Sequence, residues 1–352
     1  MGPTVALGVA LASLSGTDLR PAPWADEVQA RIAAEARRLG RHGHIAVSAI
    51  DVARGESFGF RDDVPMYLAS GVKLAFMTAV FAAVEEGRLG FDEQLSYTED
   101  DLRDGAPRLN KRPVGSTVPV RTLLADMMQY SDNAASDLFV DRLGPDFIAR
   151  TLVEQGLDEF GPISRLIEVR RGFYRELDPR ADDLSAAQVR AIRWTPIWDR
   201  QLRRLERELG VPPRTFNRKA IQAAYERFYA TGINHAPMRA VAKLLHRMLT
   251  GQLVSEKASA AMVELMLGAQ TSRNRLLGRL PRGTPVAHKT GSQFLRFCDL
   301  GVIFLPGPSP EKRGDPVIIA ICTAKADLNR AERAIAQSAR LIYDAVLRRR
   351  KS

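Results

Sequence analysis

The segment from Val72 to Val84 constrains the fold of this chain most, because it is apolar on nearly every side. A helix at a protein surface carries one apolar stripe, whereas a helix that is apolar all round lies inside a larger structure. Gly87 follows the segment and ends the predicted helix. With 352 residues, 45% of them hydrophobic, the chain has enough apolar surface to bury such a helix in a substantial core.

A hydroxyl and an amine stand at the beginning of this helix. Ser70 and Lys73 are one helical turn apart, so the amine would lie within reach of the hydroxyl and could accept its proton. A serine in the first turn also faces unpaired N–H groups, which would stabilise an oxyanion. The alternative is a surface lysine near a helix start. The same spacing at Ser309 and Lys312 lies among prolines and is a chance match.

Two further triplets follow Ser-x-x-Lys in the chain. Ser131–Asn133 reads Ser-Asp-Asn after an apolar helical run, and Lys289–Gly291 reads Lys-Thr-Gly after a strand-like stretch. These three motifs, in this order, are typical of serine β-lactamases and penicillin-binding proteins. The chain therefore resembles that superfamily, most closely its class A β-lactamase branch, over residues 25 to 347.

The resemblance implies a chemical role for each matching residue. Ser70 is the expected nucleophile, and Lys73 is its base or part of the proton relay. Ser131 would pass a proton to the leaving nitrogen, with Lys289 polarising its hydroxyl; for Ser131 alone, a helix or loop cap is the alternative. The backbone N–H groups of Ser70 and Ser292 would form the oxyanion hole.

A second group of residues is expected to hold the substrate. Asn133 would bind the acyl side chain, and the hydroxyls of Thr290 and Ser292 would bind the substrate carboxylate, assisted by the lysine of the Lys-Thr-Gly triplet and by Arg296. Gly291 would let the backbone approach closely, since it has no Cβ.

One motif of the class A branch is missing. Those enzymes release their acyl group with the glutamate of a Glu-x-x-Leu-Asn loop, and this sequence has no such string. Two alignments place Arg170 or Tyr174 where that glutamate is expected. Glu168, our candidate base, and Glu176 lie nearby but out of register, and both are equally well interpreted as solvated loop carboxylates. Without a carboxylate at the acyl group, acylation would proceed while deacylation is slow.

The stretch from Asn133 to Lys289 is 156 residues long, roughly fifty more than the resemblance predicts. The surplus, at about 179–235, predicts two amphipathic helices, at 197–209 and 218–230, forming a hairpin that borders the mouth of the site. Between residues 180 and 230 the sequence has eleven Arg or Lys and six Asp or Glu. This surplus of five positive charges is half of the chain's net charge of +10. An anionic polymer, membrane or nucleic acid would suit this charge, but without any recognition motif a solvated arginine-rich face is the better interpretation.

The predicted elements indicate an α+β fold of the β-lactamase/transpeptidase type. Strands at 44–51, 56–60, 295–305 and 316–323, with the Lys-Thr-Gly strand, would form an antiparallel sheet of about five strands flanked by helices at 25–39 and 330–347. An inserted all-α lobe would place the active site between the lobes. The expected parts are a segment 1–23, a catalytic domain 24–347 (α/β lobe 24–66 and 285–347, all-α lobe 67–284, insertion 179–235) and a basic tail 348–352.

The cysteines and the N-terminus bear on the compartment. Cys298 and Cys322 would face each other across the last hairpin if its turn centres near Pro310, and either a disulfide or two free core thiols fits that position. Residues 5–14 are apolar and end in small residues, as in a signal peptide, but no basic residue precedes them and they are too short to span a bilayer. A periplasmic or secreted protein is expected, mainly from the resemblance.

The sequence therefore predicts a serine hydrolase that opens β-lactam-type cyclic amides through an acyl-enzyme at Ser70. Two alternatives remain: a penicillin-binding protein that acts as a D-Ala-D-Ala peptidase or transpeptidase, and a β-lactam-binding sensor that does not turn over. The expected partner is a small-molecule β-lactam or peptidoglycan-like substrate. No cofactor, metal, nucleic acid or stable membrane insertion is expected, and the protein is expected to be a monomer.

Overall fold

The structure is a computed structural model that describes residues 19–193, 198–307, 309 and 312–351. The chain divides into two compact units. The first, called the sheet unit here, holds the described residues up to Gly71 and those from Ala236 onward. The second, called the helical unit, runs from Val72 to His235.

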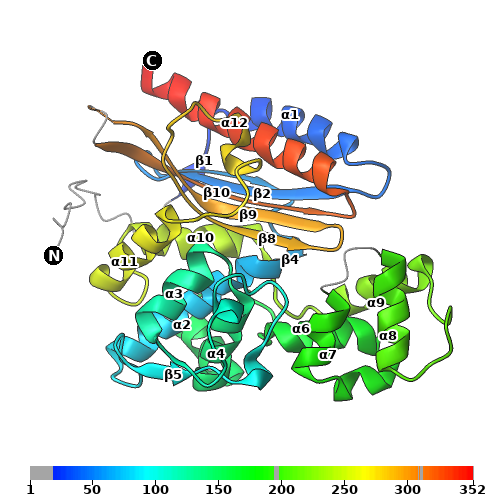
Figure 1. Ribbon diagram of the computed structural model, residues 1–352. Helices are drawn as coiled ribbons and strands as arrows, with labels where there is room; N and C mark the ends of the chain where they lie inside the picture. The colour runs from blue at the N-terminus through cyan, green and yellow to red at the C-terminus, as the bar shows by residue number, and fades with distance from the viewer. Residues whose placement is uncertain (1–18, 194–197, 308, 310–311, 352) are drawn as a thin grey trace. The chain divides into compact units, whose positions relative to one another are not determined.

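The sheet unit is built on a six-stranded sheet with the order β1-β3-β2-β10-β9-β8 (Figure 1). Every neighbouring pair is antiparallel except β1 and β3. The expected five strands are present, and the sixth, β1, is only two residues long. The strands are β1 (Arg20–Pro21), β2 (His44–Asp51), β3 (Glu56–Phe60), β8 (Val286–Gln293), β9 (Arg296–Pro306) and β10 (Arg313–Ala324).

Helices cover both faces of this sheet (Figure 1). On one face lie α1 (Ala25–Arg38) and α12 (Leu328–Lys351), and the hydrophobic core lies between them and alternate residues of the strands. On the other face lie α10 (Met238–Leu249), packed on β2 and β10, and α11 (Glu256–Leu267), packed on β8. The sequence assigned residues 67–284 to the all-α lobe, whereas α10 and α11 belong to the sheet unit.

The basic residues at the end of the chain continue α12 instead of forming a separate tail. Arg348 pairs with Glu27 at 3.1 Å, and Arg350 donates to the buried Asp51 at 2.5 Å. Arg54 also donates to the carbonyl of Arg349. These contacts explain why a run of like charges stays helical: several of the cations have partners on neighbouring parts of the sheet unit.

The helical unit surrounds the buried helix α2 (Lys73–Glu85), whose residues from Lys73 to Ala83 are all buried. Helices α3, α4 and α5 pack on α2, as its apolar sequence predicts. The other elements of this unit are β5 (Gln94–Ser96), β6 (Thr117–Pro119), α3 (Val120–Gln129), α4 (Asn133–Leu143), α5 (Pro145–Glu154), α6 (Leu166–Arg175), α7 (Ala186–Arg193), α8 (Trp198–Glu208) and α9 (Arg218–Tyr229). Two short strands, β4 (Pro65–Tyr67) and β7 (His235–Pro237), pair with each other.

The predicted insertion forms helices α8 and α9, close to their expected bounds, and also the helix α7, which the sequence analysis did not predict. Residue 197, the predicted start of the first helix, is outside the described residues. Aromatic packing joins α9 to α6: the ring of Phe173 lies 4.3 Å from the rings of both Tyr225 and Phe228. A Cβ on Gly172 would come within 2.4 Å of Phe228, so the glycine is needed for this contact.

Two further expectations concern the compartment. Cys298 and Cys322 occupy paired positions on β9 and β10 and form a disulfide, with their Cα atoms 4.1 Å apart. The structure thus resolves the choice between a bridge and two free thiols. Among the helices that the structure describes, none has the length and hydropathy that crossing a membrane requires. The apolar stretch 5–14 lies outside the described residues.

Candidate active site

Lys73 connects the predicted site residues of the helical unit. It begins α2, and its side chain is fully buried. The Nζ atom lies 2.6 Å from the carbonyl oxygen of Ser131, 3.2 Å from the Ser131 hydroxyl and 2.8 Å from Oδ1 of Asn133. Two residues of the Ser-Asp-Asn triplet therefore meet at the amine of the Ser-x-x-Lys motif.

Burial lowers the pKa of Lys73 to about 7, against the raising effect of Asp132 and Asp137. Much of the population therefore carries a neutral amine at neutral pH. A neutral amine has two donor hydrogens and one lone pair. The Ser131 carbonyl and Asn133 Oδ1 can only accept, so the Ser131 hydroxyl is the partner that can donate to that lone pair. The contact is a direct route for a proton between Ser131 and Lys73.

Asp132, the middle residue of the Ser-Asp-Asn triplet, fixes the loop that carries Ser131. Its Oδ1 accepts from the N–H of Ala135 and caps α4. Its Oδ2 accepts from the N–H groups of Arg108 and Leu109. Ser131 itself has φ of 58°, a strained value for a residue with a Cβ. The capping role considered for Ser131 thus belongs to Asp132, and the Ser131 hydroxyl points to the lysine.

The amide of Asn133 is held at both ends. Its Oδ1 accepts from Lys73, while its Nδ2 donates to the carbonyl of Asp104 at 2.7 Å. Its backbone N–H donates to the carbonyl of Gly105. A Cβ on Gly105 would lie 2.8 Å from Nδ2, so the loop at 104–105 fits closely against the asparagine. The orientation of the amide follows from these partners.

In the sheet unit, the turn that carries Ser70 lies against β8. Ser70 is half-buried in a 3₁₀ turn, Ala69–Val72, that leads directly into α2. A Cβ on Gly291 would lie 2.1 Å from the carbonyl oxygen of Leu68 and 3.2 Å from the N–H of Gly71. Glycine is therefore required where the Lys-Thr-Gly strand meets the serine turn. This contact brings the expected nucleophile and the expected oxyanion strand together.

Lys289 and Thr290, the two residues of β8 before Gly291, have defined hydrogen-bond partners. Lys289 is fully buried, and its Nζ donates to the carbonyl of Thr290 at 3.0 Å. The Thr290 hydroxyl donates to the hydroxyl of Thr271 at 2.8 Å. Ser292, the next residue on the strand, is exposed. The Lys-Thr-Gly strand thus presents a hydroxyl to solvent beside a buried amine.

The structure adds Arg275, which the sequence analysis missed. Its guanidinium donates to the carbonyls of Gly291 and Cys298, at 2.8 and 2.9 Å, and to the Ser292 hydroxyl at 2.6 Å. Burial lowers the pKa of the Arg275 guanidinium below the ordinary value of an arginine. Arg296, the arginine selected from the sequence, is also buried but donates to the carbonyl of Leu295. Several arginines precede the strand, and no spacing distinguishes Arg275 from the others.

A buried contact between a histidine and an aspartate holds the backbone beside Arg275. Nδ1 of His288 lies 2.8 Å from Oδ1 of Asp299, and Oδ2 of the same carboxylate accepts from the N–H of Leu276. His288, to which the sequence analysis assigned no role, therefore supports the segment that presents Arg275. His288 directly precedes Lys289 on β8.

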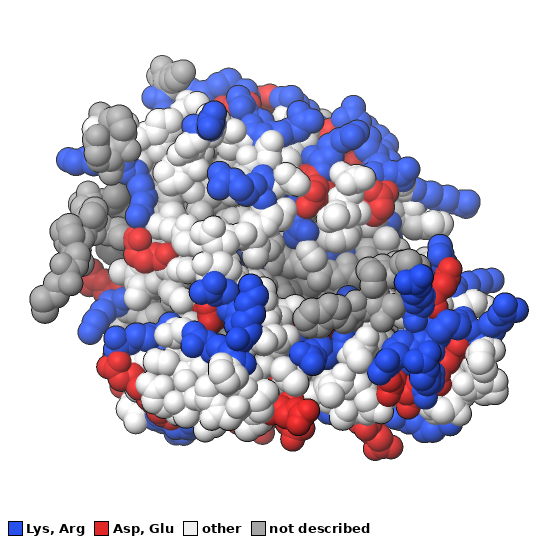
Figure 2. Space-filling model, in the orientation of Figure 1, with Lys and Arg blue, Asp and Glu red and all other residues white. Residues whose placement is uncertain are grey.

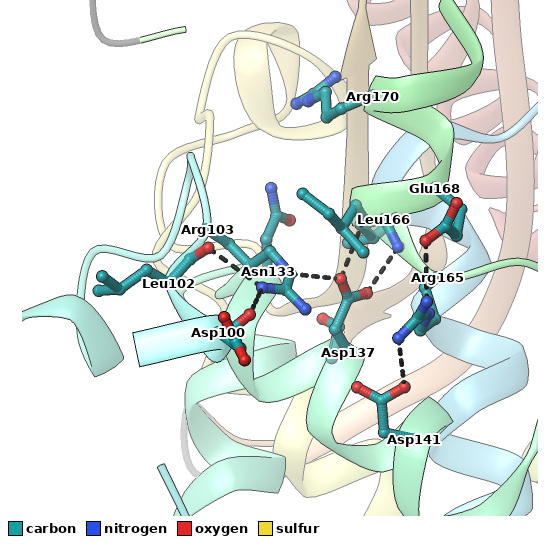
Figure 3. A network of polar contacts seen from close by, with 12 residues as sticks. Asp100, Leu102, Arg103, Asn133, Asp137, Asp141, Arg165, Leu166, Glu168 and Arg170 are labelled. Carbon is teal, nitrogen blue, oxygen red and sulfur yellow. Dashed lines mark hydrogen bonds and ion pairs between the residues drawn. The ribbon is translucent and has the colours of Figure 1, made fainter. Parts of the chain in front are cut away.

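Helix α6 contains Arg170 and Tyr174, the two residues that alignment places at the missing glutamate, and the start of this helix is fixed (Figure 3). Both oxygens of Asp137 accept backbone N–H groups, those of Leu166 and Ile167, at 2.6 and 2.9 Å. Arg103 donates to the same carboxylate at 2.7 Å, and both side chains are nearly fully buried. One helical turn further on, α6 presents Arg170.

Arg170 forms a two-pronged ion pair with Asp104. Its Nε lies 3.0 and 3.1 Å from the two carboxylate oxygens, and its Nη2 lies 2.8 Å from Oδ2. Arg193 of α7 approaches the same Oδ2 at 3.5 Å. Burial alone would raise the pKa of Asp104, but the two guanidinium groups hold it below its usual range. The group next to Asn133 is thus a bound carboxylate of low basicity.

Neither glutamate that the sequence analysis considered contacts Lys73. Oε1 of Glu168 accepts from Arg165 and Arg171, each at 2.8 Å (Figure 3). Glu176 accepts from Arg227 at 2.7 Å. Both carboxylates are bound by arginines of the helical unit, so the structure gives no support to Glu168 as a base.

A serine turn against a Lys-Thr-Gly strand, and a buried lysine that contacts a Ser-Asp-Asn triplet, are features of serine hydrolases related to β-lactamases. The chain belongs to the beta-lactamase enzyme family, whose model matches residues 25–346. The family is the one that the motifs indicated, and the expected α+β fold is confirmed.

Individual relatives agree with this assignment. The beta-lactamase SME-1 of Serratia marcescens is 23% identical over 310 residues, which cover 86% of this chain and 84% of that protein. The extended-spectrum beta-lactamase PER-1 of Pseudomonas aeruginosa is 26% identical, covering 80% and 76%. Among solved structures, the class A beta-lactamase of the last common ancestor of Gram-negative bacteria has a TM-score of 0.66 at 24% identity, covering 91% and 99%. PBP-A has a TM-score of 0.67 at 20% identity, covering 94% and 98%.

Proposed function

We propose that this protein opens β-lactam-type cyclic amides by forming an acyl-enzyme at Ser70. The observation that carries the proposal is the buried Lys73 amine, which has a pKa lowered to about 7 and contacts the Ser131 hydroxyl. Lys73 takes the proton of Ser70 as the hydroxyl attacks the carbonyl. Ser131 then gives its proton to the departing ring nitrogen and recovers one from Lys73, so the proton balance closes.

The sheet unit supplies the remaining groups. The N–H groups of Ser70 and Ser292 stabilise the oxyanion, in line with the close fit of Gly291 against the serine turn. Thr290, Ser292 and Arg275 bind the substrate carboxylate, and Arg275 takes the part that the sequence analysis gave to Arg296. Lys289 polarises the Ser131 hydroxyl in this mechanism.

Release of the acyl group is the slow step in this proposal. Hydrolysis needs a base that activates water, and the carboxylate beside Asn133, Asp104, is bound by Arg170 and Arg193. This observation favours a second candidate function, that of a penicillin-binding protein whose acyl-enzyme persists and whose natural substrate is a D-Ala-D-Ala peptide. A β-lactam sensor would share the persistent adduct but would release no D-alanine.

The proposed location is the periplasm or the exterior of the cell, with the protein acting as a monomer on a small molecule. The disulfide between Cys298 and Cys322 supports this location, because such bonds persist in oxidising compartments. Fusion to a fluorescent reporter would test this location. A reporter that matures only under oxidising conditions should become fluorescent, and one that matures only under reducing conditions should not.

Time-resolved intact-protein mass spectrometry after exposure to benzylpenicillin tests the function. We expect an adduct of penicillin mass that forms on the wild type and is absent from Ser70→Ala. Its lifetime should be much longer than the turnover time of an efficient hydrolase. A transient adduct with accumulating product would identify an efficient hydrolase instead. Release of D-alanine from a D-Ala-D-Ala peptide separates the peptidase from the sensor. Absence of any adduct would contradict the proposal.

A further inference from the structure

Two guanidinium groups share one carboxylate, that of Asp104, beside Asn133. Arg170 of α6 and Arg193 of α7 both approach Asp104, so the cluster carries a surplus of one positive charge among these residues. The hydroxyl of Tyr174, in the same cluster, does not offset this charge, because burial raises its pKa well above the ordinary value. The cluster is cationic at neutral pH.

This charge lies close to where the substrate's acyl side chain is expected. The Asp104 carbonyl accepts from Asn133, whose other amide end accepts from Lys73. Asn133 is the residue assigned to the acyl side chain, so a group bound there would extend toward Arg170 and Arg193. Their side chains are 13% and 24% exposed, respectively, which leaves both within reach of a ligand.

The cluster is held in place by well-packed elements. Asp137 fixes the first turn of α6, and the aromatic contacts of Phe173 join α6 to α9 of the insertion. Arg171 of α6 also donates to the carbonyl of Leu184, just before α7. Fixed cations in a partly buried site interact with an anion more strongly than flexible surface cations do.

We propose that Arg193, together with Arg170, selects substrates whose acyl side chain carries a carboxylate. This inference rests on the proposed acyl-enzyme at Ser70 and names the substrate class of that site. It also gives the insertion a chemical role, since α7 supplies one of the two cations.

The test compares benzylpenicillin with its α-carboxylated counterpart, carbenicillin, which differs by one carboxylate on the acyl side chain. The measured quantity is the second-order rate constant of acylation, followed by intact-protein mass. We expect the wild type to favour the carboxylated compound, and Arg193→Gln to reduce that preference about tenfold, as expected for loss of a charge-assisted contact. Arg193→Lys, which keeps the charge, should retain most of the preference.

Arg200→Gln is the matched control, since Arg200 is an exposed arginine of the same insertion, on α8. It should leave the ratio of the two rate constants unchanged. Equal rates for the two compounds on the wild type, or equal effects of the two glutamine variants, would overturn the inference while leaving the acyl-enzyme intact. Failure of both compounds to acylate the wild type would overturn the proposed function and this inference with it.

Discussion

Lys73 shows how one residue acquires a function from its surroundings. Its position in the buried part of α2 removes the solvation that normally keeps a lysine charged, and the acceptors around it are supplied by Ser131 and Asn133. The same side chain on a surface helix would remain a cation with a pKa near 10.5. The buried helix therefore provides the neutral amine that we propose as the base.

The acylation rate should follow the ionisation of Lys73. Since the neutral amine is the base and its pKa is about 7, the rate should rise with pH up to about 7 and level off above it. Well below that pH the rate should fall about tenfold for each unit. Stopped-flow or quenched mass measurements of adduct formation from pH 5 to 9 would show this, and a rate independent of pH over that range would argue against Lys73.

Arg170 should control the lifetime of the acyl-enzyme. Arg170→Glu places a carboxylate on α6 at the position where two guanidinium groups and Asp104 now meet, and Arg193 remains as a partner for it. We expect the adduct to disappear at least about tenfold faster, since a general base contributes at least that much. Arg170→Gln removes the cation without adding a base, so its adduct should persist. Equal lifetimes in the two variants would show that a base at this position has no effect.

At the scale of elements, the contact between the serine turn and β8 depends on the absence of one Cβ. Gly291→Ala would place that atom 2.1 Å from the backbone carbonyl of Leu68, which cannot move as a flexible side chain can. We expect acylation to fall at least about a hundredfold, because the oxyanion donors are displaced. Stability should decrease by about 1–3 kcal/mol.

Gly90→Ala provides the control, since its Cβ would meet nothing closer than 3.8 Å. Adduct formation and thermal unfolding would be measured on both variants. A Gly291→Ala protein that acylates like the wild type would show that the close approach has no catalytic role.

The elements differ in how well the sequence predicted them. The strands β2 and β3 have the predicted bounds, and α1, α2 and α12 differ by a few residues at their ends. Apolar periodicity marks α1 and α12, whereas an apolar run followed by Gly87 marks α2. The strand β1 has two residues and α7 has eight, too short for a periodic signal. The hairpin register predicted that Cys298 and Cys322 lie opposite each other on neighbouring strands. It did not predict whether they form a disulfide, which they do.

The site was predicted only in part, for a physical reason. Ser70, Lys73 and the two triplets are local motifs, so their places at a helix start, at the corner between α3 and α4 and on a strand follow from short-range patterns. Asp104 pairs with Arg170, which is 66 residues away in the sequence, and Arg275 contacts Gly291, which is 16 residues away. No local sequence pattern encodes such contacts. Alignment had already placed Arg170 at the position of the missing glutamate, whereas its pairing with Asp104 could be recognised only in three dimensions.

At the scale of the whole molecule, the chain carries a net charge of +10, and many of its arginines form ion pairs with carboxylates. Arg204, Arg218 and Arg227 of the insertion pair with Glu208, Asp199 and Glu176. On the face shown in Figure 2, blue and red side chains are interspersed. This arrangement agrees with the interpretation of the insertion as a solvated arginine-rich surface.

The free energy of unfolding should depend on pH through Lys73. Its pKa is about 7 in the folded state and near 10.5 when unfolded, so between these values the unfolded chain binds more protons. Stability from this group therefore rises as pH increases from about 7 toward 10.5. Lys73→Met lacks this slope, so its stability relative to the wild type should be higher at pH 6 than at pH 9.5. Denaturant titrations at both pH values would check this, and an unchanged difference would contradict a shifted pKa.

Because the Lys73 amine, our proposed base, is attached to a helix buried from Lys73 to Ala83, fraying of the surface cannot easily expose it to bulk water. Partial opening of peripheral segments should spare the chemistry, and reactivity should vanish only when that central helix loses its neighbours. Loss of β-lactam labelling during heating should consequently coincide with the slowest-exchanging amide hydrogens of α2, making the reaction a reporter of cooperative unfolding.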